Sequence, residues 1–156
     1  MTKLDNIIEE AWKHREIPDK MRKAFQDSFE TYKENPVYLF EYANALDFLG
    51  KESEAIPLYQ NALAKGISGK LMRQAKIQLG SSLSVIGENE KAISILEEVL
   101  KDTGDPAALV FLCIALFRSG ETIKSLRKSM EFILSENRGL LSDYKMTLEH
   151  YLSEIS

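Results

Sequence analysis

Apolar residues recur every three or four positions along most of this chain, which is the spacing of one face of an α-helix. Lys, Glu and Asp residues lie between them, as on the solvated face of an amphipathic helix. The pattern therefore predicts a chain made of helices. We expect two short helices within residues 1–34, followed by helices near 36–49, 53–63, 71–86, 92–100, 106–119, 121–136 and 140–155.

Glycine and proline mark the ends of the predicted helices. Gly50, Gly87 and Gly120 each follow an apolar stripe, and glycine readily adopts the left-handed conformation just after a helix. Asn35 is suited to cap the helix whose first turn holds a proline, Pro36. The chain is thus divided into helix pairs with a glycine turn inside each pair.

The glycine turns recur at nearly regular intervals. Gly50 and Gly87 are 37 residues apart, and Gly87 and Gly120 are 33 residues apart. A flexible connector around Gly66 and Gly69 accounts for the longer interval. A helix–turn–helix unit of about 34 residues is the length of a tetratricopeptide repeat. Five positions after each turn glycine stands a small residue: Ala55, Ala92 and Ser125.

Three units of the chain resemble the tetratricopeptide repeat family residue by residue. Ala43, Gly80 and Cys113 occupy the small-residue position where two helices cross closely, and a larger side chain there would push the helices apart. The amino-acid sequence is similar to those of small stand-alone bacterial members of the family. The matching positions are Leu39, Tyr42-Ala43, Leu46, Gly50, Ala55, Tyr59 and Ala62 in unit one; Leu79-Gly80, Leu83, Gly87, Ala92, Leu96 and Val99 in unit two; and Leu109, Leu112-Cys113, Leu116 and Gly120 in unit three, which departs at Ser125, Ser129 and Phe132.

The resemblance implies an all-α fold, a right-handed superhelix of antiparallel helix pairs. We expect one domain over residues 1–156. Its expected parts are a degenerate or capping helix pair (1–34), three repeats (36–69, 70–105 and 106–136) and a C-terminal helix (140–155).

Charge and composition narrow the classes of function. The formal net charge is −4 and no dense run of Lys or Arg occurs, which argues against broad affinity for nucleic acids or anionic membranes. The chain has no run of 18 apolar residues and its N-terminal segment turns acidic at once, so neither a membrane span nor a signal peptide is expected. The single cysteine fits a reducing compartment, and we expect a cytoplasmic protein.

The sequence carries no motif for catalysis or cofactor binding. The segment 66–70 has a glycine–lysine pair but not the spacing of a phosphate loop. His14 and His150 lie at opposite ends of the chain, and with one cysteine they give no metal-ligand spacing. Cys113 is interpreted as a buried structural thiol. We therefore expect no enzyme activity, no cofactor and no metal.

The resemblance also implies where a partner would bind, because the first helix of each tetratricopeptide pair lines the concave surface. A carboxylate clamp of the kind that holds chaperone tails is not expected, since Asn44 alone matches its pattern. The implied groove residues are Phe40, Asn44, Asp47 and Phe48 in unit one; Ile77, Ser81, Ser84 and Val85 in unit two; and Val110, Ile114, Phe117 and Arg118 in unit three.

Two interpretations of this groove stay open at the level of sequence. In the first, a peptide or helix of an unknown partner protein docks in the groove. In the second, the protein forms a homodimer and its groove is covered by its own helices. The final helix is suited to cap the solenoid or to fill a groove. Its apolar face consists of Leu140, Leu141, Tyr144, Leu148, Tyr151 and Leu152.

Overall fold

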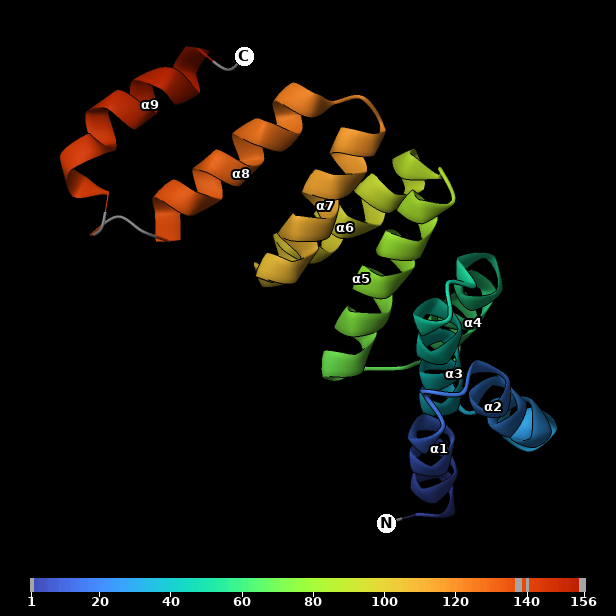
Figure 1. The fold of residues 1–156 in the computed structure, drawn as a ribbon. Helices are drawn as coiled ribbons and strands as arrows, with labels where there is room; N and C mark the ends of the chain where they lie inside the picture. Colours follow the sequence, from blue (N-terminus) through green and yellow to red (C-terminus); the bar gives the residue numbers. More distant parts are fainter. Residues whose placement is uncertain (1, 137–138, 140, 155–156) are drawn as a thin grey trace.

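The computed structural model describes residues 2–136, 139 and 141–154. Within these residues the chain forms α-helices and one short 3-10 helix, η1, without a strand (Figure 1). The predicted all-α class is confirmed, and none of the described helices is long and apolar enough to cross a membrane. The elements are α1 (Lys3–Lys13), α2 (Pro18–Tyr32), α3 (Pro36–Phe48), α4 (Glu52–Ala64), α5 (Gly69–Val85), α6 (Asn89–Thr103), α7 (Pro106–Arg118), α8 (Thr122–Glu136), η1 (Ser142–Tyr144) and α9 (Lys145–Glu154).

The predicted turn glycines and helix caps are present. Gly50, Gly87 and Gly120 have φ angles of 67°, 87° and 89°, so each turn uses the left-handed conformation that a side chain would strain. The Asn35 side chain accepts hydrogen bonds from the first turn of α3, and the Asp105 side chain does the same for α7. Local sequence therefore sets where these helix pairs begin and turn.

The helix pairs stack into a curved array that runs from α1 at one end to α9 at the other (Figure 1). The backbones of the first helices, α1, α3, α5 and α7, approach one another in sequence. Within the described residues the second helices show no such approach, and long side chains bridge them, as in the Arg22–Glu54 ion pair (2.7 Å). Because the inner side of a curved stack is the shorter one, the first helices form the concave face.

Aromatic side chains join the pair α1–α2 to the first repeat. The Phe25 and Tyr42 rings stack with centroids 5.2 Å apart, and the Tyr38 hydroxyl donates to the Phe25 carbonyl. Phe25 and Met21 are fully buried in the same core as the repeats. The N-terminal pair is therefore packed as a further layer of the stack.

The two helices of unit two cross at a point where only glycine fits. A Cβ atom built on Gly80 would lie 2.6 Å from Leu96 Cγ, well inside van der Waals contact. In unit three two small residues meet at the corresponding crossing. Cys113 lies on α7, and the hydroxyl of Ser129 on α8 contacts its sulfur at 3.2 Å. The departure of unit three from the repeat pattern thus compensates for the larger residue on its first helix.

The C-terminal end differs from the predicted single helix over 140–155. Residues 142–144 form η1 and α9 follows, while Leu140 and Ile155 lie outside the described residues. Among the described residues, α9 contacts α8 and η1 and reaches none of the first helices α3, α5 and α7 (Figure 1). In this structure α9 therefore does not fill the concave face.

Candidate functional site

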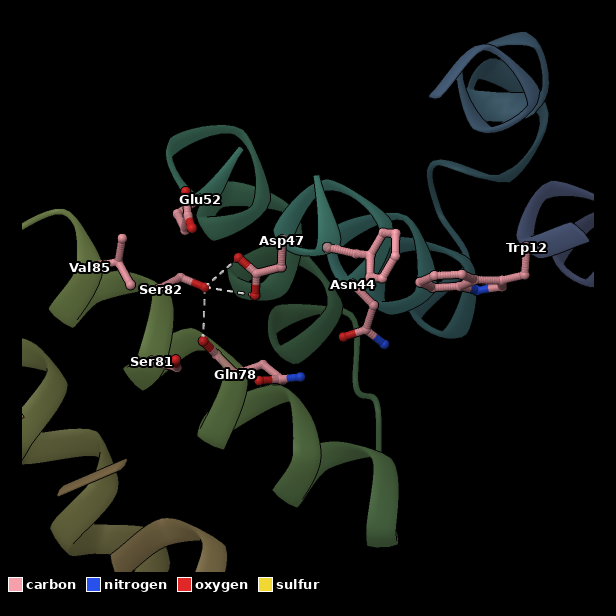
Figure 2. Close-up of a pocket in the computed structure, with 9 residues that line it drawn as sticks. Trp12, Asn44, Asp47, Glu52, Gln78, Ser81, Ser82 and Val85 are labelled. Atoms are coloured by element: carbon pink, nitrogen blue, oxygen red, sulfur yellow. Dashed lines mark hydrogen bonds between the residues drawn. The ribbon is translucent and has the colours of Figure 1, made fainter. Parts of the chain in front are cut away.

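A pocket of about 490 Å³ opens on the concave face between α1, α3 and α5 (Figure 2). We call it the acidic pocket, because its charged residues are two carboxylates, Asp47 and Glu52. Of the described residues that line it, none is Lys or Arg. Its lining is Trp12, Asn44, Asp47, Phe48, Glu52, Gln78, Ser81, Ser82 and Val85.

Asp47 lines the acidic pocket and is held by hydroxyl groups. Ser82 Oγ on α5 lies 2.8 Å from both carboxylate oxygens, and Tyr59 OH on α4 lies 2.9 Å from Oδ2. Burial raises the pKa of Asp47, the hydrogen bonds from Ser82 and Tyr59 lower it, and the nearby negative charge of Glu52 raises it further. The net direction is upward, so this carboxylate lacks a full set of compensating partners.

Two aromatic rings, which we call the aromatic wall, also line the pocket. Trp12 and Phe48 meet edge to face with centroids 6.1 Å apart. Trp12 Nε1 donates to Glu41 Oε2 at 3.0 Å, which fixes the orientation of the indole. Phe48 remains 60% exposed despite its size. The pocket therefore combines fixed aromatic surface with partly buried negative charge.

A second pocket of about 530 Å³ adjoins the first along α5, and we call it the central pocket. Asn44 and Gln78 line both pockets, so the two are continuous along the concave face. Arg73 Nε lies 3.0 Å from Asp105 Oδ2 as an ion pair, without the alignment of a hydrogen bond. The lining of the central pocket is Phe40, Glu41, Asn44, Lys70, Leu71, Arg73, Gln74, Ile77, Gln78, Asp105, Ala107 and Phe111.

Most groove residues predicted in units one and two gather around these pockets. Asn44, Asp47, Phe48, Ser81 and Val85 line the acidic pocket. The remaining three are covered more than expected: Phe40 and Ile77 are 4% and 6% exposed and border the central pocket, and Ser84 is buried. Phe40 packs on Tyr59 of its own repeat, with ring centroids 6.1 Å apart, and Ser84 Oγ accepts a hydrogen bond from Arg118 of the next repeat.

The groove residues predicted in unit three lie apart from both pockets. Val110, Ile114 and Phe117 are exposed on α7, with Phe117 63% accessible. Arg118 turns back toward unit two, and its Nη1 donates to Ser84 Oγ at 3.2 Å. The structure thus separates the predicted set into a pocket region and an exposed patch on α7.

Sequence reasoning does not assign Trp12, Glu52, Gln78 or Ser82 to the groove. Trp12 belongs to the predicted degenerate or capping pair, although α1 continues the row of first helices. The signal for Ser82 is its hydroxyl, which lies on the first helix of unit two and is buried. A buried hydroxyl needs a hydrogen-bond partner, and here the partner is Asp47 of the preceding repeat.

Among the described residues, no group of three or more His, Cys, Asp or Glu side chains is arranged to hold a metal ion. Cys113 is a half-buried free thiol beside Ser129, more exposed than the buried thiol that the sequence predicted. The arrangement of hydrogen-bond acceptors, amides and aromatic rings suits binding.

Solved structures of similar shape share this architecture. MamA 41-end from Desulfovibrio magneticus RS-1 has a TM-score of 0.70 at 18% identity, covering 97% of this chain and 90% of that chain. A putative kinesin light chain from Podosopora anserina with nearly identical TPR-like repeats has a TM-score of 0.74 at 15% identity, covering 98% and 85%. At these identities the likeness concerns the fold alone. No curated protein matches the chain.

A family model described as Tetratrico peptide repeat matches residues 36–155, which is most of the chain. The match includes the three predicted units and continues through all of α9. The helix pairs, the turn glycines and the row of first helices agree with it. This protein belongs to the tetratricopeptide repeat family, whose members in general serve as protein–protein interaction modules.

Proposed function

We propose that this protein binds a peptide segment or helix of another protein on its concave face, across the acidic and central pockets. The observation that carries the proposal is the continuity of the two pockets, which share Asn44 and Gln78. Together they offer a lined surface along the first helices α3 and α5. Concave sites with a few placed polar groups among apolar ones are typical binding sites.

Exposed apolar side chains beside the pockets support the same proposal. Phe48 and Val85 line the acidic pocket and remain largely exposed. Burying such surface against a partner releases about 25 cal/mol for each Å² removed from water. Asn44, Gln78 and Ser81 supply hydrogen-bonding groups that fix the register of a bound segment.

Comparative capture tests this function. Wild-type protein is immobilised beside the double variant Phe48→Lys/Val85→Lys and the control Ile17→Lys, which adds charge at an exposed apolar residue outside both pockets. Circular dichroism first establishes that all three are folded. We expect a partner retained by the wild type and the control and lost from the double variant. Equal retention by all three proteins would contradict binding in these pockets.

Self-association is a second candidate function, and unit three favours it. The repeat intervals align Val110 with Ile77 and Phe40, which are 6% and 4% exposed. Val110 is 56% exposed, and Leu126 on α8 is 49% exposed where its counterpart in unit one, Ile56, is buried. A second copy of the chain, packed on this face, would cover what a further repeat covers elsewhere in the stack.

Light scattering over a dilution series tests this second candidate. We expect a dimer in the wild type that dissociates on dilution, and a monomer at every concentration for Phe117→Lys/Leu126→Lys. Phe48→Lys is the matched control, because it carries the same change on the concave face of unit one. A monomeric wild type at high concentration would exclude self-association.

A further inference from the structure

The acidic pocket contains negative charge that the protein itself does not neutralise. Asp47 and Glu52 both line it, and of the described lining residues none carries a positive charge. Two carboxylates at one concave, partly desolvated site repel each other more strongly than they would in water. A positively charged group entering the pocket would relieve that repulsion.

The carboxylate of Asp47 retains capacity to accept further hydrogen bonds. A carboxylate has about four acceptor positions. The hydroxyls of Ser82 and Tyr59 have one proton each, and each has a second acceptor within reach. Ser82 Oγ also lies 2.9 Å from the Gln78 carbonyl, and Tyr59 OH lies 2.8 Å from Asn44 Oδ1. At least two acceptor positions therefore remain for a ligand that donates from the pocket.

The aromatic wall favours a flat cation. Trp12 is held by its hydrogen bond to Glu41, and Phe48 meets it edge to face. Cations bind over aromatic faces, Trp most strongly, and guanidinium groups also stack on such faces. Carboxylates and aromatic rings in one pocket match the two modes by which an arginine side chain binds.

We propose that the acidic pocket recognises an arginine side chain of the segment that binds the concave face. This inference rests on the proposed function and gives the chemistry of the partner at one position. The guanidinium donates to Asp47 and Glu52 while its plane lies against Phe48, which Trp12 supports from its far side (Figure 2). Asn44 and Gln78, at the border with the central pocket, are placed to contact the backbone on one side of that arginine.

A peptide-display selection tests the inference with a random library in place of the natural partner. The library lacks tryptophan and is selected against wild-type protein and against Asp47→Asn/Glu52→Gln. The control, Glu16→Gln/Glu90→Gln, removes the same number of negative charges at exposed sites. We expect peptides enriched in arginine from the wild type and the control, and no such enrichment from the pocket variant.

Binding of the selected peptides then tests the mechanism. Trp12 is the only tryptophan of the chain, so intrinsic fluorescence reports on the acidic pocket directly. Replacing the enriched arginine by citrulline, which keeps the shape and removes the charge, is expected to raise the Kd for wild-type protein at least tenfold. For Asp47→Asn/Glu52→Gln the same replacement is expected to change the Kd little.

The outcomes separate this inference from the proposed function. Selected peptides that lose binding to Phe48→Lys/Val85→Lys but show no arginine preference overturn the inference and support the proposed function. A preference for lysine or for apolar residues at every position overturns it in the same way. Selection of no peptide by wild-type protein overturns both.

Discussion

The carboxylate of Asp47 lowers the stability of the folded protein near neutral pH, and the same group is the one that we propose binds a ligand. Its carboxylate is partly buried between α3, α4 and α5, next to Tyr59, Ser82 and Glu52. The pKa of Asp47 is raised on folding, chiefly by burial. A carboxyl group with a raised pKa in the folded state favours folding when protonated, and this contribution is lost as the pH rises through the raised pKa.

Asp47→Asn is therefore expected to melt a few degrees higher than wild type near neutral pH. The amide oxygen can accept from one hydroxyl while the amide N–H donates to the other, so the network survives without the charge. The difference is expected to shrink as the pH falls through the raised pKa toward the ordinary value of 3.8. Melting curves followed by circular dichroism across this range measure it.

Asp102→Asn serves as the control, because Asp102 is exposed at the end of α6. It should show no such change of the melting difference with pH. A lower melting temperature for Asp47→Asn than for wild type near neutral pH would show that the charge is compensated, contrary to the environment described here.

Gly80 makes a second prediction at the residue scale. In wild-type protein, Gly80→Ala is expected to lower the free energy of unfolding by about 1–3 kcal/mol, because its methyl group would collide with the buried Leu96. In a Leu96→Ala background the collision is absent. There the same change should raise the free energy of unfolding by about 0.5–1 kcal/mol, since alanine favours a helix more than glycine.

Urea unfolding of the wild type, both single variants and the double variant measures this coupling. Leu96→Ala alone is expected to cost about 2–5 kcal/mol. An effect of Gly80→Ala with the same sign and size in both backgrounds would mean that the crossing does not depend on this contact.

At the scale of helices, Asp105 links the start of α7 to α5. Its Oδ1 accepts from the Ala107 N–H at 2.9 Å, and its Oδ2 pairs with Arg73 at 3.0 Å. Asp105→Ala removes both contacts and is expected to lower the free energy of unfolding by about 1–2 kcal/mol, mostly through the lost cap. Asp105→Asn keeps an acceptor for the cap and should cost less than about 1 kcal/mol.

Urea titrations of both variants test this division of roles. Equal losses for Asp105→Asn and Asp105→Ala would assign the stabilisation to the ion pair. Asp105 caps α7, which carries the exposed residues Val110 and Phe117. Asp105→Ala should therefore also destabilise α7 more than α3, which is capped by Asn35.

Helix pairs were predictable from the sequence because their determinants are local. The turn glycines, the Asn35 cap and the small residue at Gly80 each act within one unit. The burial of Phe40 and Ile77 was not predictable in the same way, because it depends on how closely other helices pack on them, as Tyr59 of α4 does on Phe40. That Trp12 lines the acidic pocket was not predicted for a related reason, because it depends on α1 lying in the row of first helices.

The whole molecule becomes less tightly packed toward its C-terminal end. No residue of α8 or α9 is buried, whereas α3 and α5 each contribute several residues to the core. In a stack of repeats each unit is stabilised by its neighbours, and a unit with a neighbour on one side opens most readily. The exposed patch formed by Val110, Phe117 and Leu126 lies at this end.

Hydrogen exchange should reveal both the gradient and the effect of self-association. At low protein concentration, amides in α8 and α9 are expected to exchange faster than those in α3 to α6, because they open without disrupting the core. If a second copy covers the patch of unit three, raising the concentration will slow exchange in α7 and α8 and leave α1 and α2 unchanged. Phe117→Lys/Leu126→Lys should abolish this dependence on concentration. Exchange of α8 that is fast and independent of concentration in wild-type protein would exclude self-association through this patch, and exchange of α8 as slow as that of α5 would contradict the gradient.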